Sequence, residues 1–161
     1  MGTNKMNERN EYLAFIIADE KYCILVNRVR EVIEYTKLTK LPNTIGYMKG
    51  LVNLRGTGIP VIDLRTKFGL PEAELTRLTS IIVMEVQEGE EKKLIGAMAD
   101  SVQEVIEMAD EGIEAAPRFG PMVSNNYIHG IGKRNSEFHI ILDIDKIFSA
   151  EEISSLSKTG E

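Results

Sequence analysis

Short hydrophobic runs bounded by turn residues recur along most of the chain. Residues 12–17 and 22–26 are two such runs, and the polar tripeptide Asp19-Glu20-Lys21 separates them. Runs of four to eight apolar residues between turn signals favour strands over helices. This pattern therefore predicts a mainly β fold. Later runs of the same kind cover residues 29–35, 51–55, 59–64, 80–86, 94–108 and 139–144.

The clearest helix signals are polar residues at cap positions. Asp63 and Asp143 each precede a short segment with helical character, and an aspartate there accepts backbone N–H groups and complements the helix dipole. Ser149 and Glu152 have the spacing of a capping box, which predicts a C-terminal helix after Ser149. Such a short helix is stable only when it packs on the body of the protein.

The order of these segments occurs twice along the chain. Val29–Glu34 reads VREVIE and Val102–Glu107 reads VQEVIE, so five of the six residues are identical. Tyr47–Gly50 reads YMKG, and Tyr127–Gly130, eighty positions later, reads YIHG. One match between valine-rich strands can arise by chance, whereas several matches in the same order indicate a duplication.

The duplication predicts two related parts within one domain. Residues 12–69 and 80–148 are the approximate halves of a single domain over residues 12–161, and residues 1–11 form a disordered leader. Each half carries about five short strands, which suits a small closed barrel without exposed edges. We expect two such barrels to pack through a shared apolar seam, with strands open to exchange between the halves.

Composition narrows the class of protein. The chain has 161 residues, with 19 lysines and arginines against 25 acidic residues, and a formal net charge of −6. Nucleic-acid binding needs a concentrated basic face, so we expect no nucleic-acid partner. The single cysteine, Cys23, excludes an internal disulfide and a cysteine-cluster zinc site. No apolar run is long enough for an export signal or a membrane span, so we expect a cytoplasmic protein without membrane insertion.

No catalytic or metal-binding pattern is found in the sequence. His129 and His139 do not lie at metal-ligand spacing with Cys23, and the G-x-S-x-G, Walker and H-E-x-x-H motifs are absent. His139 falls on a strand, where we expect a half-buried or exposed side chain. Cys23 lies inside an apolar strand, which favours a packed, inert thiol. We therefore expect a binding module with no catalytic residues, no metal and no cofactor.

Arg55 distinguishes the two halves. It follows an apolar strand and precedes Gly56-Thr57-Gly58, which we expect to form a tight hairpin turn, whereas the second half has Asn135 at the matching place. This arginine is either an ordinary solvated side chain or a positioned guanidinium that binds a carboxylate. Glu31, on the first of the two repeated strands, is the candidate partner.

The segments Gly50–Gly56 (GLVNLRG) and Ile59–Arg65 (IPVIDLR) resemble the CheW family of bacterial chemotaxis coupling proteins, and the resemblance extends from Tyr12 to about Leu156. It implies two related five-stranded SH3-like β-barrels packed together, with short helices and a C-terminal helix. It also implies a non-catalytic adaptor that links the cytoplasmic tips of methyl-accepting chemoreceptors to the regulatory domain of the chemotaxis histidine kinase CheA. That kinase domain has the same fold, so the resemblance implies alternating rings in membrane-associated receptor arrays.

In the family, the receptor-binding groove lies between the barrels. Carried over position by position, this groove comprises Val29, Glu31, Arg55, Val102 and Val105, while kinase-contact residues stay unassigned. We expect an apolar receptor helix to lie across the valines, with Arg55 and Glu31 on the polar rim. The alternative from another class is a small β-barrel protein that binds a small ligand, or an enzyme, at an unrecognised site.

Overall fold

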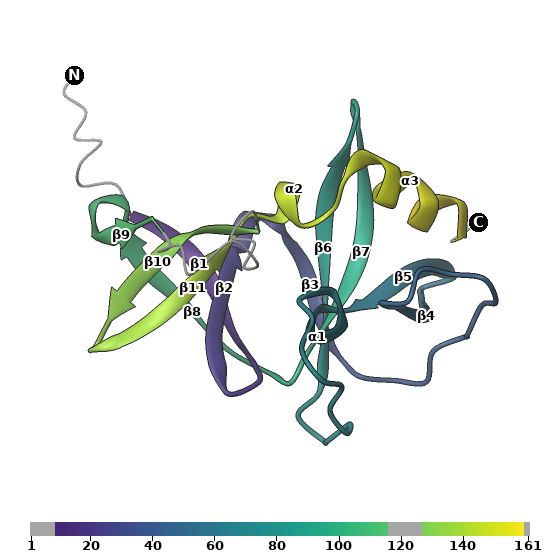
Figure 1. Cartoon of the computed structure of the whole chain (residues 1–161), viewed down its shortest axis with the longest axis horizontal. Helices are drawn as coiled ribbons and strands as arrows, with labels where there is room; N and C mark the ends of the chain where they lie inside the picture. The colour runs from purple at the N-terminus through teal and green to yellow at the C-terminus, as the bar shows by residue number, and fades with distance from the viewer. Residues whose placement is uncertain (1–8, 116–126, 160–161) are drawn as a thin grey trace.

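The computed structural model describes residues 9–115 and 127–159 (Figure 1). Its strands form two separate sheets, and its helices are short, so the predicted mainly β fold is confirmed. The first strand begins at Arg9, inside the predicted leader, because residues 9–11 pair with residues 107–109. Residues 1–8 lie outside the described part of the chain.

The first sheet has the strand order β8-β1-β2-β11-β10-β9, and the second has the order β3-β6-β7-β5-β4. The first sheet consists of β1 (Arg9–Ile17), β2 (Glu20–Leu25), β8 (Ser101–Ala109), β9 (Ile113–Glu114), β10 (Ile128–Arg134) and β11 (Glu137–Leu142). The second sheet consists of β3 (Val29–Glu34), β4 (Met48–Leu54), β5 (Thr57–Asp63), β6 (Ser80–Glu88) and β7 (Glu91–Ala99). Single 3₁₀ turns precede β3 and β9, at Val26–Arg28 and Asp110–Gly112.

Each sheet combines strands from both halves of the sequence. β1 and β2 pair with β8 and β11, while β6 and β7 pair with β3 and β5. The pairs β2–β11 and β5–β7 are parallel. Parallel neighbours need a long connection. Between β2 and β11 the chain crosses to the second sheet and returns, whereas between β5 and β7 it runs through α1 and β6 and stays with the second sheet (Figure 1). Neither sheet is therefore complete without both halves.

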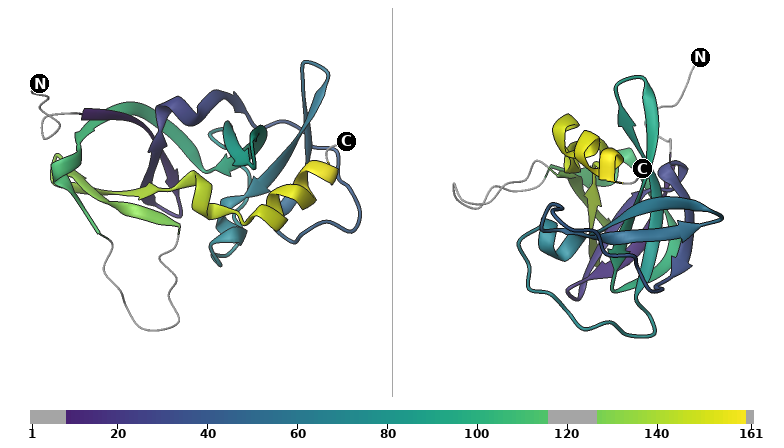
Figure 2. Two further views of the ribbon diagram at one scale, coloured as in Figure 1. Left: turned by 90° about the horizontal axis from the view of Figure 1, so that it is seen from above. Right: turned by 90° about the vertical axis from the view of Figure 1, so that its right-hand side faces the viewer.

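Each sheet curls around its own hydrophobic interior (Figure 2). In the second sheet, Ile33 on the edge strand β3 packs on a buried cluster that includes Val52 on the opposite edge strand β4. In the first sheet, a Cβ atom at Gly132 of β10 would lie 2.6 Å from the sulfur of Met108 on the edge strand β8. The two ends of each sheet thus approach one another, as expected for two related barrels.

The first sheet has six strands rather than the five expected. The additional strand is β9, a two-residue strand that pairs with β10, whereas the equivalent segment of the second sheet forms an isolated bridge at Thr39. Both segments lie directly against a glycine. A Cβ atom at Gly50 would lie 2.5 Å from the carbonyl oxygen of Thr39, and one at Gly130 would lie 2.8 Å from that of Glu114. This close approach explains why the Tyr-x-x-Gly sequence occurs in both halves.

A third hydrophobic cluster, which we call the seam core, lies between the two sheets. It unites Phe15 and Ile24 of the first sheet with Ile82 and Met84 of the second, and all four side chains are at most 1% exposed. Complete burial of one such side chain stabilises the folded state by ~1.5–3 kcal/mol. The seam core therefore joins the two sheets into one packed body.

The two helices after β5 and β11 begin at the predicted aspartate caps. α1 (Leu64–Lys67) follows Asp63, and α2 (Ile144–Ile147) follows Asp143. In each case the aspartate carboxylate accepts a hydrogen bond from the backbone N–H two residues later, at 2.9 Å and 3.1 Å respectively. These short-range bonds explain why the aspartate recurs in both halves.

The predicted C-terminal helix is α3 (Ala150–Thr159), and its capping box forms in full. The Oγ atom of Ser149 accepts the N–H of Glu152 at 3.1 Å, and the Glu152 carboxylate accepts the N–H of Ser149 at 2.9 Å. The buried Ile153 belongs to the seam core. The helix follows α2 and lies against β5 and β6, so the C-terminal segment also connects the first sheet to the second (Figure 1).

A partly buried ion pair connects α3 to α1. The Nζ atom of Lys67 lies 2.6 Å from the Glu152 carboxylate and 4.6 Å from the ring centre of Tyr47, and two further rings, Tyr127 and Phe148, each lie at 5.4 Å. The Tyr47 hydroxyl also donates to Glu152. Burial raises the pKa of Glu152, but the bonds from Lys67, Tyr47 and the Ser149 backbone outweigh it and lower that pKa to about 2.

His139 is more buried than its place on a strand suggested. Its side chain is 3% exposed, and its Nδ1 atom has no hydrogen-bond partner in the described part of the chain. Burial lowers its pKa, and the nearby charges of Lys21 and Arg134 lower it further, against an opposing effect of Glu137. The repeat-related residue in the first half is Ile59, which is also buried.

Replacing Lys67 with methionine should lower the free energy of unfolding by about 2 kcal/mol, because a hydrogen bond to a charged group contributes ~1.5–3 kcal/mol. The Glu152 pKa is depressed in the folded state, so its contribution is complete above pH 4.5 and is lost as the pH falls towards about 2. Urea titrations at pH 7, 4 and 3 should show that the free energy of unfolding falls less at acid pH in Lys67→Met than in the unmodified protein. A variant with the same free energy of unfolding and the same pH dependence would contradict this assignment.

Replacing His139 with isoleucine, the residue of the other repeat, should raise the free energy of unfolding by about 1 kcal/mol, because it removes a buried polar atom without a partner. The His139 pKa is lower in the folded state, so the unfolded chain binds the proton first and stability falls as the pH drops below about 6.5. His139→Ile should flatten this dependence between pH 7 and 5 in thermal melts. A destabilised variant with the original pH dependence would refute the prediction.

Candidate functional site

The two repeated V-x-E-V motifs lie on the edge strands β3 and β8, and both strands start at the seam core. Val29 pairs with Met84, and Val102 pairs with Phe15, so each motif begins beside a buried seam residue. Both valines are half-buried and pack against the seam core. Two of the predicted groove residues therefore pack against the same buried cluster, although they are 73 positions apart in the sequence.

Arg55 and Glu31 form the predicted ion pair. The Arg55 guanidinium donates to the Glu31 carboxylate at 2.6 Å, and this bond lowers the pKa of Glu31. The Glu31 side chain is 29% exposed, whereas that of Arg55 is 73% exposed. Arg55 therefore holds a carboxylate with one end and still presents most of its surface to solvent.

The hairpin turn that carries Arg55 differs from the expected one. Leu54 pairs with Thr57, so the turn consists of Arg55 and Gly56, which both have positive φ, at 51° and 89°. Two-residue turns with two positive φ angles match the twist of the flanking strands. The Asn53 side chain accepts the N–H of Gly56 at 2.8 Å. The guanidinium is thus carried by the turn itself rather than by the strand before it.

The second repeat contains an equivalent ion pair that the sequence analysis missed. Arg134 lies 3.7 Å from Glu104, and Glu104 is the repeat mate of Glu31. Each pair connects an edge strand, β3 or β8, with the hairpin at the opposite side of the same curled sheet. Both pairs therefore bridge the opening of a sheet next to a V-x-E-V motif.

Exposed valines continue each motif away from the seam. Val105 is 49% exposed, and its repeat mate Val32 is 40% exposed. Val32 was absent from the predicted groove. The repeat could have identified it, since the fourth residue of the motif is valine in both halves. An apolar stripe with one half-buried and one exposed valine thus occurs once on each sheet.

The described residues include one buried thiol and no cluster of metal ligands. Burial raises the pKa of the Cys23 thiol to about 12, which leaves it protonated at neutral pH. Within residues 9–115 and 127–159, no three histidine, cysteine or acidic side chains gather into a group that could hold a metal ion. None of the helices in the described part has the length and hydropathy to cross a membrane.

Comparisons with known proteins identify the family. Residues 11–152 match the model of the CheW-like domain family. The chemotaxis protein CheW of Klebsiella aerogenes is 33% identical, over 94% of this chain and 89% of its own length, and that of Bacillus subtilis is 29% identical, over 95% and 96%. The crystal structure of the scaffolding protein TtCheW from Thermoanaerobacter tengcongensis superposes with a TM-score of 0.79 at 29% identity, over 90% of this chain and 96% of that one.

These matches cover nearly all of the described fold, with both sheets and both repeated motifs. The chain belongs to the CheW family. Its resemblance to that family, first indicated by the GLVNLRG and IPVIDLR segments, is thereby confirmed.

Proposed function

We propose that the protein is a non-catalytic chemotaxis adaptor that couples the cytoplasmic tips of transmembrane chemoreceptors to the regulatory domain of the histidine kinase CheA. Its relatives are named chemotaxis proteins, and a structural neighbour is named a scaffolding protein. The proposal places the protein in the cytoplasm, recruited to membrane-associated receptor arrays. It assigns no cofactor and no chemistry to the chain itself.

The observation that carries this proposal is the pair of apolar stripes on either side of the seam core. Val29 and Val102 lie on the seam, and Val105 extends the second stripe towards solvent. A receptor helix fits such a surface through residues spaced at i, i+3, i+4 and i+7, with its apolar face against the valines. Glu31 and Arg55 border the first stripe and offer charged partners to polar residues of the helix.

The guanidinium of Arg55 is suited to contact the partner directly. One N–H group of the guanidinium donates to Glu31 and fixes the orientation of the side chain. The guanidinium has further N–H groups, and the side chain is largely exposed, so these groups can bind a partner. A planar guanidinium presents five donors in a rigid arrangement, which favours recognition of a carboxylate or a carbonyl on the receptor helix. Arginine side chains of this kind often dominate the binding energy of an interface.

Coupling requires a second interface, to the kinase. A regulatory domain of the same fold can pair with one of the curled sheets and leave the seam accessible to a receptor. Each contact is weak alone, and an array multiplies the effective concentration of the partners. A ligand signal would then change how receptor and kinase are held together, without a reaction on this protein.

Replacing Arg55 with glutamate should weaken binding to a receptor-tip fragment at least tenfold, which corresponds to about 1.4 kcal/mol, because it puts two carboxylates side by side and removes the guanidinium. Calorimetric titration of the whole chain measures this affinity. Binding to the isolated kinase regulatory domain should stay unchanged and shows that the variant is folded.

The chain offers a matched control in the second repeat. Arg134→Glu makes the same change of charge beside Glu104, but Arg134 is outside the proposed groove. It should leave receptor binding within about twofold of the unmodified protein. Equal losses in both variants would indicate a general electrostatic effect, and no loss in Arg55→Glu would remove Arg55 from the receptor site.

A further inference from the structure

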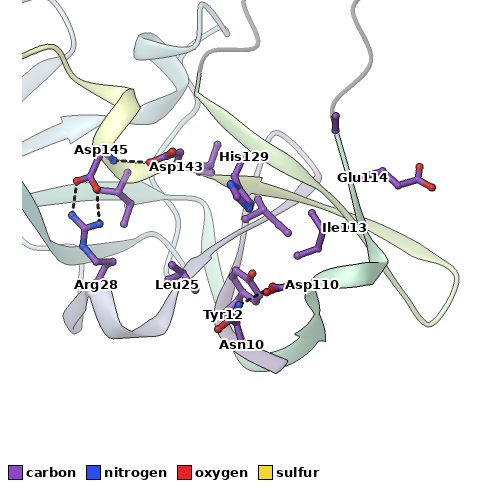
Figure 3. Close-up of a pocket in the computed structure, with 14 residues that line it drawn as sticks. Asn10, Tyr12, Leu25, Arg28, Asp110, Ile113, Glu114, His129, Asp143 and Asp145 are labelled. Atoms are coloured by element: carbon purple, nitrogen blue, oxygen red, sulfur yellow. Dashed lines mark hydrogen bonds and ion pairs between the residues drawn. The ribbon is translucent and has the colours of Figure 1, made fainter. Parts of the chain in front are cut away.

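Two hollows occupy equivalent places in the two repeats. The first, which we call the acidic pocket, has a volume of about 570 Å³ and lies at one end of the first sheet (Figure 3). The second, the basic pocket, has a volume of about 1120 Å³ and lies at the corresponding end of the second sheet. Neither pocket is lined by the five residues of the proposed receptor groove.

The equivalence rests on the backbone rather than on the shape of the hollows. The acidic pocket is lined by Ile113–Glu114, which rests on Gly130, and the basic pocket by Leu38–Thr39, which rests on Gly50. Asp143, which caps α2, lines the acidic pocket, and Asp63, which caps α1, lines the basic pocket. A hollow therefore lies beside the same backbone frame in each repeat.

The charges that line the two pockets are opposite in sign. Three lysines and two carboxylates line the basic pocket, where Lys49 pairs with Glu72 at 2.7 Å. Four carboxylates and a single arginine line the acidic pocket, together with His129. At the place after the repeated strand where the first half has Lys37, the second half has Asp110. The two pockets share their backbone frame, so the opposite sign of their charge comes from the side chains that line them.

The arginine of the acidic pocket is already engaged. Arg28 donates to both carboxylate oxygens of Asp145, at 2.7 Å and 2.9 Å (Figure 3). It also donates to the carbonyl oxygen of Glu85 at 2.8 Å. Of the other three acidic residues, Glu114 points its side chain away from the pocket (Figure 3). Asp110 accepts a hydrogen bond from Asn10 and Asp143 one from the backbone of Asp145, but neither carboxylate forms an ion pair with a lysine or arginine of the described residues. The pocket thus keeps an uncompensated negative charge.

The floor of the acidic pocket is apolar. Tyr12, Ile141, Leu142 and Ile144 line it and are each at most 5% exposed. Leu25, which is 37% exposed, adds an accessible apolar wall. An apolar floor below a carboxylate rim is complementary to a long basic side chain, which has an aliphatic stem and a charged head.

We propose that the acidic pocket is a docking site for a basic segment of a partner protein, which inserts a lysine or arginine side chain beside the carboxylates of Asp110 and Asp143. The stem packs on the apolar floor, and neighbouring apolar residues of the segment contact Leu25 and Ile113. The basic pocket repels the same segment. This site goes beyond the proposed receptor groove and does not depend on it.

The test uses the whole chain, isotopically labelled, and nuclear magnetic resonance titration with the peptide acetyl-Leu-Arg-Leu-amide. Saturable shifts should concentrate on backbone amides around the acidic pocket, such as Ile113 and Leu142, and weaken with added salt. Acetyl-Leu-Gln-Leu-amide, which lacks the charge, should bind at least about fivefold more weakly, as expected for loss of one or two exposed charge contacts.

Variants of both pockets complete the test. The variant Asp110→Asn preserves side-chain shape and should weaken binding of the arginine peptide about fivefold, whereas Lys37→Gln in the basic pocket should not weaken it. Equal binding of the two peptides, shifts centred on the basic pocket, or no saturable shift would each overturn the proposal. Equally tight binding of free argininamide would also overturn it, in favour of a small organic cation. None of these results bears on the Arg55→Glu measurement.

Discussion

The seam core is the constraint on which the rest of the structure depends. It holds buried side chains of both sheets in one cluster, and each sheet is itself built from strands of both sequence halves. A half-chain would leave two sheets incomplete and one face of the seam exposed to water. Burial of large apolar side chains supplies most of the favourable free energy of folding, so the two sheets are stabilised jointly.

The same constraint positions the proposed receptor site. Val29 and Val102 pack on the seam, and the strands that carry them leave it in different sheets. The distance between Val29 and Val102 is therefore fixed by the packing of the seam core and not by surface loops. The ion pairs Arg55–Glu31 and Arg134–Glu104 lie next to these strands and connect the edges of each curled sheet. Under the proposed function, Arg55 and Glu31 would therefore contribute both to sheet closure and to receptor recognition.

Local features of the sequence predicted much of this arrangement. Short apolar runs bounded by turn residues indicated the strands. Short-range spacing identified the aspartate caps and the Ser149–Glu152 capping box, because these bonds involve neighbours in the chain. The repeat indicated two related parts. The Arg55–Glu31 pair was also anticipated, since both residues lie in distinctive motifs.

Long-range features escaped prediction for a physical reason. The burial of His139, the Lys67–Glu152 pair and the strand β9 each depend on contacts between segments that are far apart in the sequence, and no local pattern encodes those contacts. The predicted position of the hairpin turn was wrong by one residue, because Gly56 and Gly58 both permit positive φ and the sequence does not distinguish them. The opposite charges of the two pockets become meaningful only when the repeat is superposed on the fold.

Native-state hydrogen exchange of the whole chain tests the central claim most directly, namely that strand exchange and the seam core make the two sheets one cooperative unit. The slowest amides of β1 and β2 in the first sheet, and of β6 and β7 in the second, should share an opening free energy within about 1 kcal/mol of each other. They should also respond equally to denaturant. A first sheet that opens several kcal/mol below the second, or the reverse, would contradict the account.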